Sequence, residues 1–126
     1  TYTIPLSALQ KEMVLQLRNI QFDHNSSVLT PSSYAELDKL VKLMQDNPSM
    51  QIELSAHTDD VGSEQYNMRL SQQRGESVRK YLIRKGVDAK RIIAKGYGKN
   101  KPLVPNDSDE NRAINRRVEF TINEIE

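Results

Sequence analysis

The sequence predicts an α+β fold, a two-layer βαβαββ sandwich whose helices pack on one face of a mixed sheet. Two kinds of pattern lead to this prediction. Residues 50–57 alternate strictly between apolar and polar side chains, which is the period of a strand with one buried face. Two longer stretches, 30–46 and 63–85, instead have the composition and apolar spacing of helices. Short β-compatible runs before and after these stretches supply the other strands.

The size of the chain indicates one domain. Its 126 residues, 37% of them hydrophobic, suffice for a single core and are too few for two comfortable ones. We assign residues 1–12 to a lead-in segment and residues 13–126 to the domain. No apolar run approaches the roughly 18 residues that a membrane span needs, and the first residues lack the pattern of a secretory leader. An exported form is therefore expected to be an excised or processed piece.

Charge and cysteine content exclude several classes of function. Eighteen basic and seventeen acidic residues leave a formal charge of +1, so no overall field draws the chain to nucleic acid or to an anionic membrane. The chain has no cysteine, which excludes disulfides, thiolate metal sites and a lipid-attachment cysteine within these residues. Recognition of a partner must therefore depend on a local site.

The first half of the domain predicts one strand and one helix. The apolar run at 13–22 favours an extended strand. Thr30 before Pro31 is typical of a helix start, with the hydroxyl as N-cap and the proline in the first turn. Asn47 before Pro48 ends this helix near residue 46, because a residue that precedes proline disfavours helical geometry. The apolar stripe of the helix consists of Leu37, Leu40, Val41 and Met44.

A strand, a turn and a long helix follow. The strand at 50–57 leads through the turn at 58–62 into the proline-free helix at 63–85, and Gly86 suits its left-handed C-terminal cap. We interpret Gly75, in mid-helix, as a sign of close packing against another backbone. The apolar face of the strand comprises Met50, Ile52, Leu54 and Ala56, and its polar face Gln51, Glu53, Ser55 and His57.

The last part of the chain predicts two strands and a long loop. Strands are expected at 91–97 and 118–122, and the loop 98–111 between them carries two prolines and many polar residues. Strand-to-helix turns lie at one rim of a sheet, where ligands of α/β proteins often bind. The turn at 58–62 is such a place.

The long helix carries an arginine on its apolar side. On a helical wheel, Asn67 and Arg74 fall within the arc of the apolar face formed by Leu70, Val78, Tyr81 and Leu82. A guanidinium there is costly unless it is paired or reaches a wet cleft. Arg74 is therefore either a partner of a carboxylate such as Asp59, an arginine that snorkels to the helix edge, or a receptor for an anionic ligand.

Asp59 likewise has two interpretations. An acidic residue just before a helix commonly caps its N-terminus. If Asp60 or Ser63 serves as the cap instead, Asp59 is free to accept a ligand ammonium. Asp59 and Arg74 would then offer one negative and one positive group to a zwitterionic amino acid.

These residues lie in a motif that resembles the OmpA C-terminal family, of the OmpA, Pal and MotB type. Residues 57–87 read HTDDVGSEQYNMRLSQQRGESVRKYLIRKGV, with HTD, YN, LS and R at the spacing of that family. Three further segments are similar to it: IQFDHNSSVL at 20–29, RIIAKGYGKNKP at 91–102 and NRAINRRVEF at 111–120. The resemblance covers residues 13–124. It departs from the family at Ala56, where a glycine often precedes the HTD run, and at Glu110-Asn111, where an acidic residue and a glycine usually precede the arginine.

The resemblance implies a non-catalytic module of a Gram-negative envelope protein that binds peptidoglycan through the meso-diaminopimelate of the stem peptide. It assigns the ligand ammonium to Asp59 and the carboxylate to Arg74. It also implies a periplasmic location, with a tether to the outer membrane through the rest of a parent protein, whether barrel, lipoprotein, stator or scaffold. Further pocket walls are implied for Phe22, Asp23, His24, Thr58, Asn67 and Leu70.

Two short patterns in the sequence could indicate a metal site or an enzymatic site. His57, Asp59 and Asp60 could suggest a metal site. Two of them point in alternate directions on an extended chain, and no further strong ligand follows at helical spacing, so no metal is predicted. Residues 77–80 spell S-x-x-K, but no K-T-G or S-D-N partner accompanies them. No cofactor is predicted, and a cell-wall-processing enzyme remains as an alternative function.

An RNA-binding α+β module is the second alternative. Such modules stack bases on sheet aromatics, whereas this chain has five Tyr and two Phe without that motif, so no nucleic-acid partner is predicted. The basic residues Arg112, Arg116 and Arg117 are interpreted as a solvated rim or as members of intramolecular ion pairs.

Overall fold

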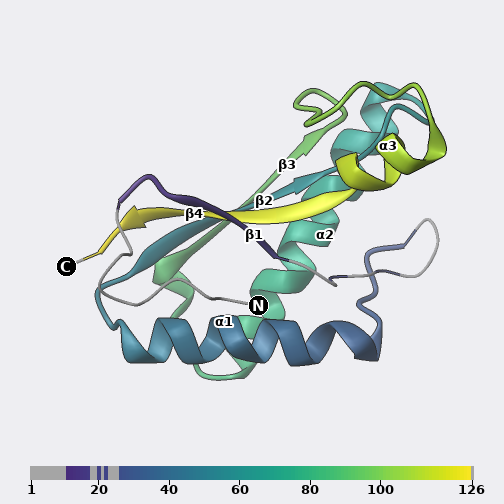
Figure 1. Ribbon diagram of the computed structural model, residues 1–126. Coiled ribbons are helices and arrows are strands. Elements are labelled where there is room, and N and C mark those ends of the chain that lie inside the picture. Colours follow the sequence, from purple (N-terminus) through teal and green to yellow (C-terminus); the bar gives the residue numbers. More distant parts are fainter. Residues whose placement is uncertain (1–10, 18–19, 21, 23–25, 126) are drawn as a thin grey trace.

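The computed structural model describes residues 11–17, 20, 22 and 26–125 of the chain. These residues contain one four-stranded mixed sheet in the order β1-β4-β2-β3, with the two longer helices on one of its faces (Figure 1). The predicted α+β sandwich is confirmed. The elements are β1 (Val14–Leu17), α1 (Tyr34–Asp46), β2 (Gln51–His57), α2 (Glu64–Arg84), β3 (Ile92–Gly98), α3 (Asp109–Asn115) and β4 (Arg117–Glu124).

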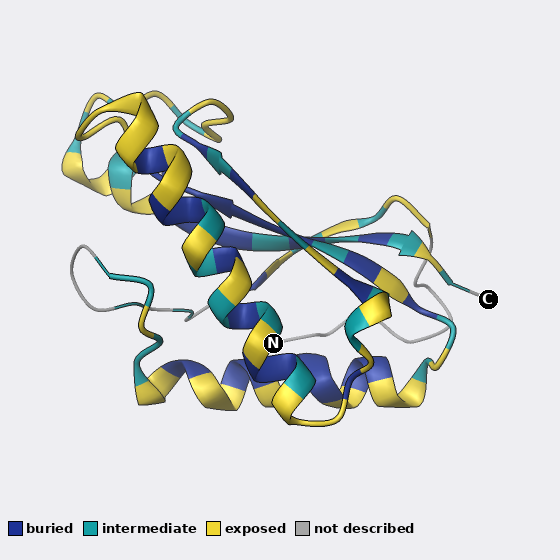
Figure 2. Cartoon of the chain, turned by 180° about the vertical axis from the view of Figure 1, so that it is seen from behind, coloured by how far each residue is buried: buried dark blue, intermediate teal, exposed yellow. Residues whose placement is uncertain are grey.

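The core lies between the sheet and the two longer helices. Strand β2 pairs parallel with β3 and antiparallel with β4, which pairs antiparallel with β1. The predicted apolar faces of both helices are buried, and Figure 2 shows the exposed side of α1 turned away from the sheet. None of the described helices is long and apolar enough to cross a membrane. Core residues at 2% exposure or less include Leu37, Leu40, Met44, Ile52, Leu54, Val78, Leu82, Ile92, Phe120 and Ile122.

Strand β2 is buried on both faces at its C-terminal end. The predicted alternation holds at its start, where Gln51 is exposed and Ile52 buried, but Ser55 and His57 are buried as well. The ring of Tyr97 stacks on His57 with centroids 5.2 Å apart, and covers this end of the second face. The prediction of a half-buried strand is therefore wrong for its last residues, which approach the loops at the rim.

The boundaries of the first two elements differ from the prediction. Within the described residues of the run 13–22, β1 covers Val14–Leu17, and Phe22 forms an isolated bridge with Leu29. The side chain of Thr30 makes no capping bond to a backbone N–H. Its hydroxyl instead lies within hydrogen-bond distance of the Ser32 hydroxyl, at 3.0 Å. A 3₁₀ turn at Pro31–Ser33 precedes α1, which ends at Asp46 as predicted.

The predicted lead-in is described only at its end. The backbone N–H of Glu12 donates to the carbonyl of Ile122 at 2.6 Å, which joins this residue to β4 just before β1 begins. Residues 1–10 lie outside the described part of the chain, so the domain boundary at residue 12 stays a prediction.

Helix α2 covers the free edge of β3. The amide of Gln72 donates to the carbonyl of Ala94 at 3.0 Å and accepts from the N–H of Gly96 at 2.8 Å, as a neighbouring strand would. The Ser71 hydroxyl accepts from the N–H of Gly98 at 3.0 Å. At the start of β3, the guanidinium of Arg79 donates to the carbonyl of Ile92. An edge covered in this way is closed to pairing with another chain.

The closest approach of α2 and β3 occurs at Gly96. A Cβ on this residue would overlap the backbone of Gln72, with the Cα of Gln72 only 2.7 Å away. At Gly75 a Cβ would meet the Cβ of Ala94 at 3.6 Å, which is ordinary van der Waals contact. Gly75 does lie against the backbone of β3, with the N of Lys95 3.8 Å from such a Cβ, but the glycine that the closest approach requires is Gly96 on the strand.

Helix α3 lies partly within the predicted loop 98–111. Ser108 caps it by accepting from the N–H of Asn111 at 3.1 Å. Asn115, fully buried, holds the preceding loop by accepting from the backbone of Leu103 at 2.8 Å and donating to the carbonyl of Val104 at 2.9 Å. A helix of seven residues is too short to show a periodic apolar stripe, which is why the sequence did not predict it.

Candidate functional site

A cavity of about 790 Å³ lies at the rim of the sheet where β2 ends. Its walls come from the end of β2, the loop after it, the first half of α2, and the segment from α3 to the start of β4. Two of the predicted site residues, Asp23 and His24, lie outside the described residues. The other predicted residues all line the cavity: Phe22, Thr58, Asp59, Asn67, Leu70 and Arg74.

The loop after β2 is held by its own polar groups. Ser63 caps α2, because its hydroxyl accepts from the N–H of Tyr66 at 3.1 Å, which confirms one of the predicted alternatives. Asp59 instead accepts from the N–H of Val61 at 3.0 Å, and the amide of Asn67 donates to the carbonyl of Val61 at 3.0 Å. Gly62 adopts φ +94°, a conformation that favours glycine. The loop thus presents Asp59 to the cavity.

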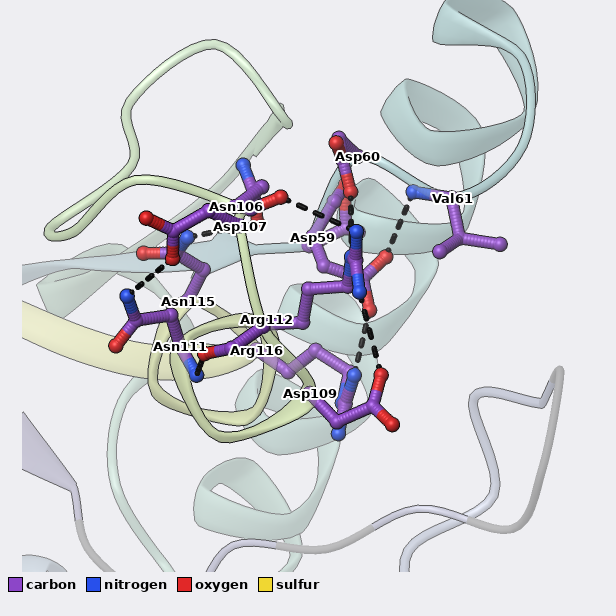
Figure 3. Close-up of polar contacts among 12 residues, drawn as sticks. Asp59, Asp60, Val61, Asn106, Asp107, Asp109, Asn111, Arg112, Asn115 and Arg116 are labelled. Carbon is purple, nitrogen blue, oxygen red and sulfur yellow. Dashed lines mark hydrogen bonds and ion pairs between the residues drawn. The ribbon is translucent and has the colours of Figure 1, made fainter.

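Asp59 is already paired in this structure. Its Oδ2 accepts from Arg116 at 2.5 Å, and the residue is only 8% exposed (Figure 3). The expectation that Asp59 is free when another residue caps the helix is therefore wrong. The suggested pair between Asp59 and Arg74 is not formed either, because Arg116 takes that position.

Arg74 is a partly buried cation on the opposite wall. Its Nε donates to the carbonyl of Ser26 at 2.9 Å, and its guanidinium carbon lies 4.9 Å from the ring centroid of Phe22. Among the described residues, no carboxylate lies within ion-pair distance of Arg74. Burial lowers the pKa of Arg74, and the charge of Arg116 acts in the same direction, while Tyr66 and Asp59 oppose them. An anionic ligand would offset this cost of burying the cation.

Three predicted wall residues shape the cavity from beneath. Thr58 is buried, with its hydroxyl donating to the carbonyl of Asp59 at 2.9 Å and its N–H donating to that of Gly98 at 2.9 Å. Asn67 and Leu70 are 2% and 8% exposed. These residues hold the loop and helix in place and leave the charged groups to Asp59 and the arginines.

The C-terminal arginines form ion pairs, as one of the predicted interpretations states. Arg112 pairs with Asp60 at 3.1 Å, and Arg117 pairs with Glu119 at 3.1 Å. Arg116 and Arg117 both line the cavity, and the sequence predicted neither as a site residue; Arg116 is the one that pairs with Asp59. Fifty-seven positions separate the two partners, so no local pattern could have indicated their contact.

His57 also lines the cavity. Its side chain is 3% exposed, and its Nε2 lies 3.5 Å from Glu119 without hydrogen-bond geometry. Within the described ranges, no group of three His, Cys, Asp or Glu residues could hold a metal ion. The polar and charged side chains that line the cavity can form ion pairs and hydrogen bonds with a ligand.

Comparison with known proteins identifies the family. The chain matches the model of the OmpA family over residues 21–116. It is 38% identical over 104 residues to outer membrane porin F of Pseudomonas fluorescens, an alignment that covers 82% of this chain and 32% of that protein. Peptidoglycan-binding protein ArfA of Mycobacterium tuberculosis is 35% identical over 104 residues, with 82% and 32% covered. The chain thus spans about a third of the length of these relatives.

A solved structure agrees with this assignment. The peptidoglycan-associated lipoprotein from Burkholderia pseudomallei matches with a TM-score of 0.73 at 28% identity, over 89% of this chain and 90% of that one. The fold, the motif at 57–87 and the family match over most of the chain lead to the same conclusion. The resemblance drawn from the motifs is confirmed, and this chain belongs to the OmpA family.

Proposed function

We propose that this domain binds peptidoglycan non-covalently and anchors an envelope protein of which it forms a part. The observation that carries the proposal is the placement of Asp59 and Arg74 on one cavity of about 790 Å³. The names of two relatives support it, since ArfA is called peptidoglycan-binding and the Burkholderia protein peptidoglycan-associated. A site in the periplasm, with a tether to the outer membrane, is part of the same proposal.

The ligand group that we propose is the distal end of meso-diaminopimelate. That end carries an ammonium and a carboxylate on one carbon, and so matches one carboxylate and one guanidinium. In the proposed complex the ammonium binds Asp59 and the carboxylate binds the forked donors of Arg74. The mechanism is equilibrium binding without bond cleavage. A small ligand buries few atoms and loses freedom on binding, so modest affinity per domain is expected.

The first test is retention on intact sacculi. Wild-type protein should sediment with peptidoglycan, and free diaminopimelate should compete. Arg74→Ala should lose retention while the domain stays folded, because Arg74 lies at the cavity wall outside the apolar core. Arg79→Ala is the matched control, since Arg79 lies on the same helix and also donates its Nε to a backbone carbonyl at 2.9 Å. Retention by Arg74→Ala with an unchanged melting temperature would refute this role.

The second test asks whether Arg74 recognises the distal carboxylate of the ligand. A lysine-type stem peptide offers only the ammonium and leaves Arg74 without its partner, which costs roughly 2 to 5 kcal/mol or about 30-fold to several thousand-fold in affinity. Calorimetric titration of matched diaminopimelate and lysine muropeptides should show this preference. Arg74→Ala should erase it, and Arg74→Lys should lose most of it, because an ammonium cannot form two parallel bonds. Equal affinity of the wild type for both peptides would exclude the diaminopimelate mechanism.

A further inference from the structure

The face of the sheet that the two longer helices leave free carries a line of side chains along β3 (Figure 1). The side chains of Ile93, Lys95 and Tyr97 point away from the helices, because the residues between them on the strand face α2. Lys101, in the loop that follows, joins this line, since its Nζ lies 4.3 Å from the ring centroid of Tyr97. We call these four residues the β3 strip. None of the four lines the cavity described above.

The two lysines of the β3 strip hold their charges beside one aromatic ring. The Nζ atoms of Lys95 and Lys101 lie 5.2 Å and 4.3 Å from the ring centroid of Tyr97. Both lysines are exposed, and neither forms an ion pair with a carboxylate of the described residues. The backbone at Lys101 is fixed, because the guanidinium of the buried Arg117 donates to its carbonyl at 3.0 Å. The sheet thus presents two neighbouring cations to an anionic partner.

The carboxylate beside the β3 strip is held by hydrogen bonds. Glu53 on β2 lies opposite Ile93 in the register of the two strands. Its Oε2 accepts from the hydroxyl of Tyr97 at 2.7 Å and from that of Ser55 at 3.2 Å. The carboxylate is therefore engaged by its neighbours on the sheet, and the ammonium groups of the two lysines remain available to a partner.

An exposed apolar side chain completes the β3 strip. Ile93 is 57% exposed and lies two positions before Lys95 on the same face of β3. A single exposed isoleucine is ordinary on a protein surface. Here it lies in line with a tyrosine and two lysines. This combination suits the surface of a lipid bilayer, because a tyrosine ring is amphipathic and lysines are attracted to anionic headgroups.

We propose that the β3 strip docks this domain onto an anionic phospholipid surface. The two lysines pair with phosphates of the headgroups, and Ile93 enters the headgroup layer beside the ring of Tyr97. A formal charge of +1 gives the whole chain no strong attraction to such a surface, so docking depends on this local arrangement and is weak and sensitive to salt. Because the β3 strip lies outside the cavity, a docked domain can still hold a ligand there.

The first measurement is sedimentation with lipid vesicles. Wild-type protein should sediment with vesicles of equal parts phosphatidylglycerol and phosphatidylcholine, and should stay in solution with phosphatidylcholine alone. Added salt should weaken the sedimentation. The double variant Lys95→Gln/Lys101→Gln should partition about tenfold or more less strongly, since each lysine near an anionic surface contributes about fivefold.

The matched control is the double variant Lys80→Gln/Lys85→Gln. It removes the same charge from α2 and its C-cap, in the helical layer of the domain. Lys85 also lies over a tyrosine, with its Nζ 5.5 Å from the ring centroid of Tyr81. If docking uses the free face of the sheet, this control should lower the partition by less than about threefold.

The second measurement is the fluorescence of Ile93→Trp. The chain contains no tryptophan, so the new side chain is the only indole in this variant. Its emission should shift to shorter wavelength when phosphatidylglycerol vesicles are added, and the variant should bind more tightly than wild type, because tryptophan favours the headgroup layer. Adding the two glutamine substitutions of the β3 strip should reduce the shift at the same lipid concentration.

Three outcomes would overturn this role of the β3 strip. They are failure of wild type to sediment with the anionic vesicles, equal partition of the two double variants, and sedimentation of Ile93→Trp without a fluorescence shift. The last outcome would indicate attraction to any polyanion. Lys95→Gln/Lys101→Gln should be retained on sacculi as wild type is, so the test leaves the proposed function to be decided by its own experiments.

Discussion

At the scale of single residues, a partly buried polar cluster of His57, Arg117 and Glu119 lies on the sheet beside the cavity. His57 lies opposite Arg117 across β2 and β4, and Glu119 interacts with both of them, at 3.5 Å and 3.1 Å. The adjacent His57 is the main reason for the lowered pKa of Glu119; Arg117 acts in the same direction, and burial opposes them. The ionised form of Glu119 is thus favoured by folding.

This arrangement predicts a pH dependence of stability. Because the pKa of Glu119 is lower in the folded chain, its contribution is fully present above the unfolded value of about 4.3 and is lost as pH falls through the folded value. Below about pH 4.3, the unfolding free energy of Glu119→Gln should therefore fall less steeply than that of wild type, by less than about 1.4 kcal/mol per pH unit. Urea titrations from pH 6 to 3 measure both slopes, and parallel curves would contradict the assignment.

Among the elements, the contact of α2 with β3 decides how the long helix sits on the sheet. Side chains of α2 bind the edge of β3, and the missing side chain at Gly96 lets the two backbones approach. Arg74 and Asn67 lie on the same helix, so the position of α2 also sets one wall of the cavity.

Two alanine substitutions should differ in sign because of this contact. Gly96→Ala places a Cβ against the backbone of Gln72 and forces the helix away, at a cost of about 2 kcal/mol or more. Gly75→Ala adds a methyl in mid-helix that meets its neighbours at ordinary van der Waals distance, and should stabilise by up to about 1 kcal/mol. Chemical denaturation of both variants tests this, and equal destabilisation would show that Gly75 is packed as tightly as Gly96.

At the scale of the whole molecule, the cavity joins segments that are distant in the chain. The loop after β2 is clamped to α3 by the pairs Asp59–Arg116 and Asp60–Arg112 (Figure 3). Asn115 in turn anchors α3 to the loop before it. The charged wall of the site therefore depends on a buried amide that never reaches the cavity.

Asn115→Ala should weaken both stability and binding. It removes bonds to the backbone at Leu103 and Val104, for an expected loss of about 2 to 3 kcal/mol. Hydrogen exchange should rise in the loop 103–106, and retention on sacculi should fall as Arg116 loses its support. Asn111→Ala, on the exposed side of the same helix, should change stability by less than about 0.5 kcal/mol. Unchanged exchange in Asn115→Ala would show that the loop is held by other contacts.

Much of the fold could be predicted because its signals are local. Local signals mark the ends of the two longer helices. Asn47 follows the end of α1, Ser63 caps the start of α2, and Gly86 takes a positive φ after its end. Helix α3 was missed because seven residues show no period, and Thr30 failed as a cap because a 3₁₀ turn intervenes. The candidate pocket residues were placed largely by resemblance to the OmpA family, and those described do line one cavity.

By itself the sequence determined the order of the four strands and the two longer helices, the apolar faces that form the core, and the presence of Asp59 and Arg74 near one rim of a sheet. Only the tertiary structure decided which arginine pairs with Asp59, and which glycine lets α2 approach β3. The physical reason is the separation along the chain over which each kind of interaction acts. Periodicity and capping act over a few residues, whereas the partner of a buried charge is chosen by whichever distant segment the packing brings within reach.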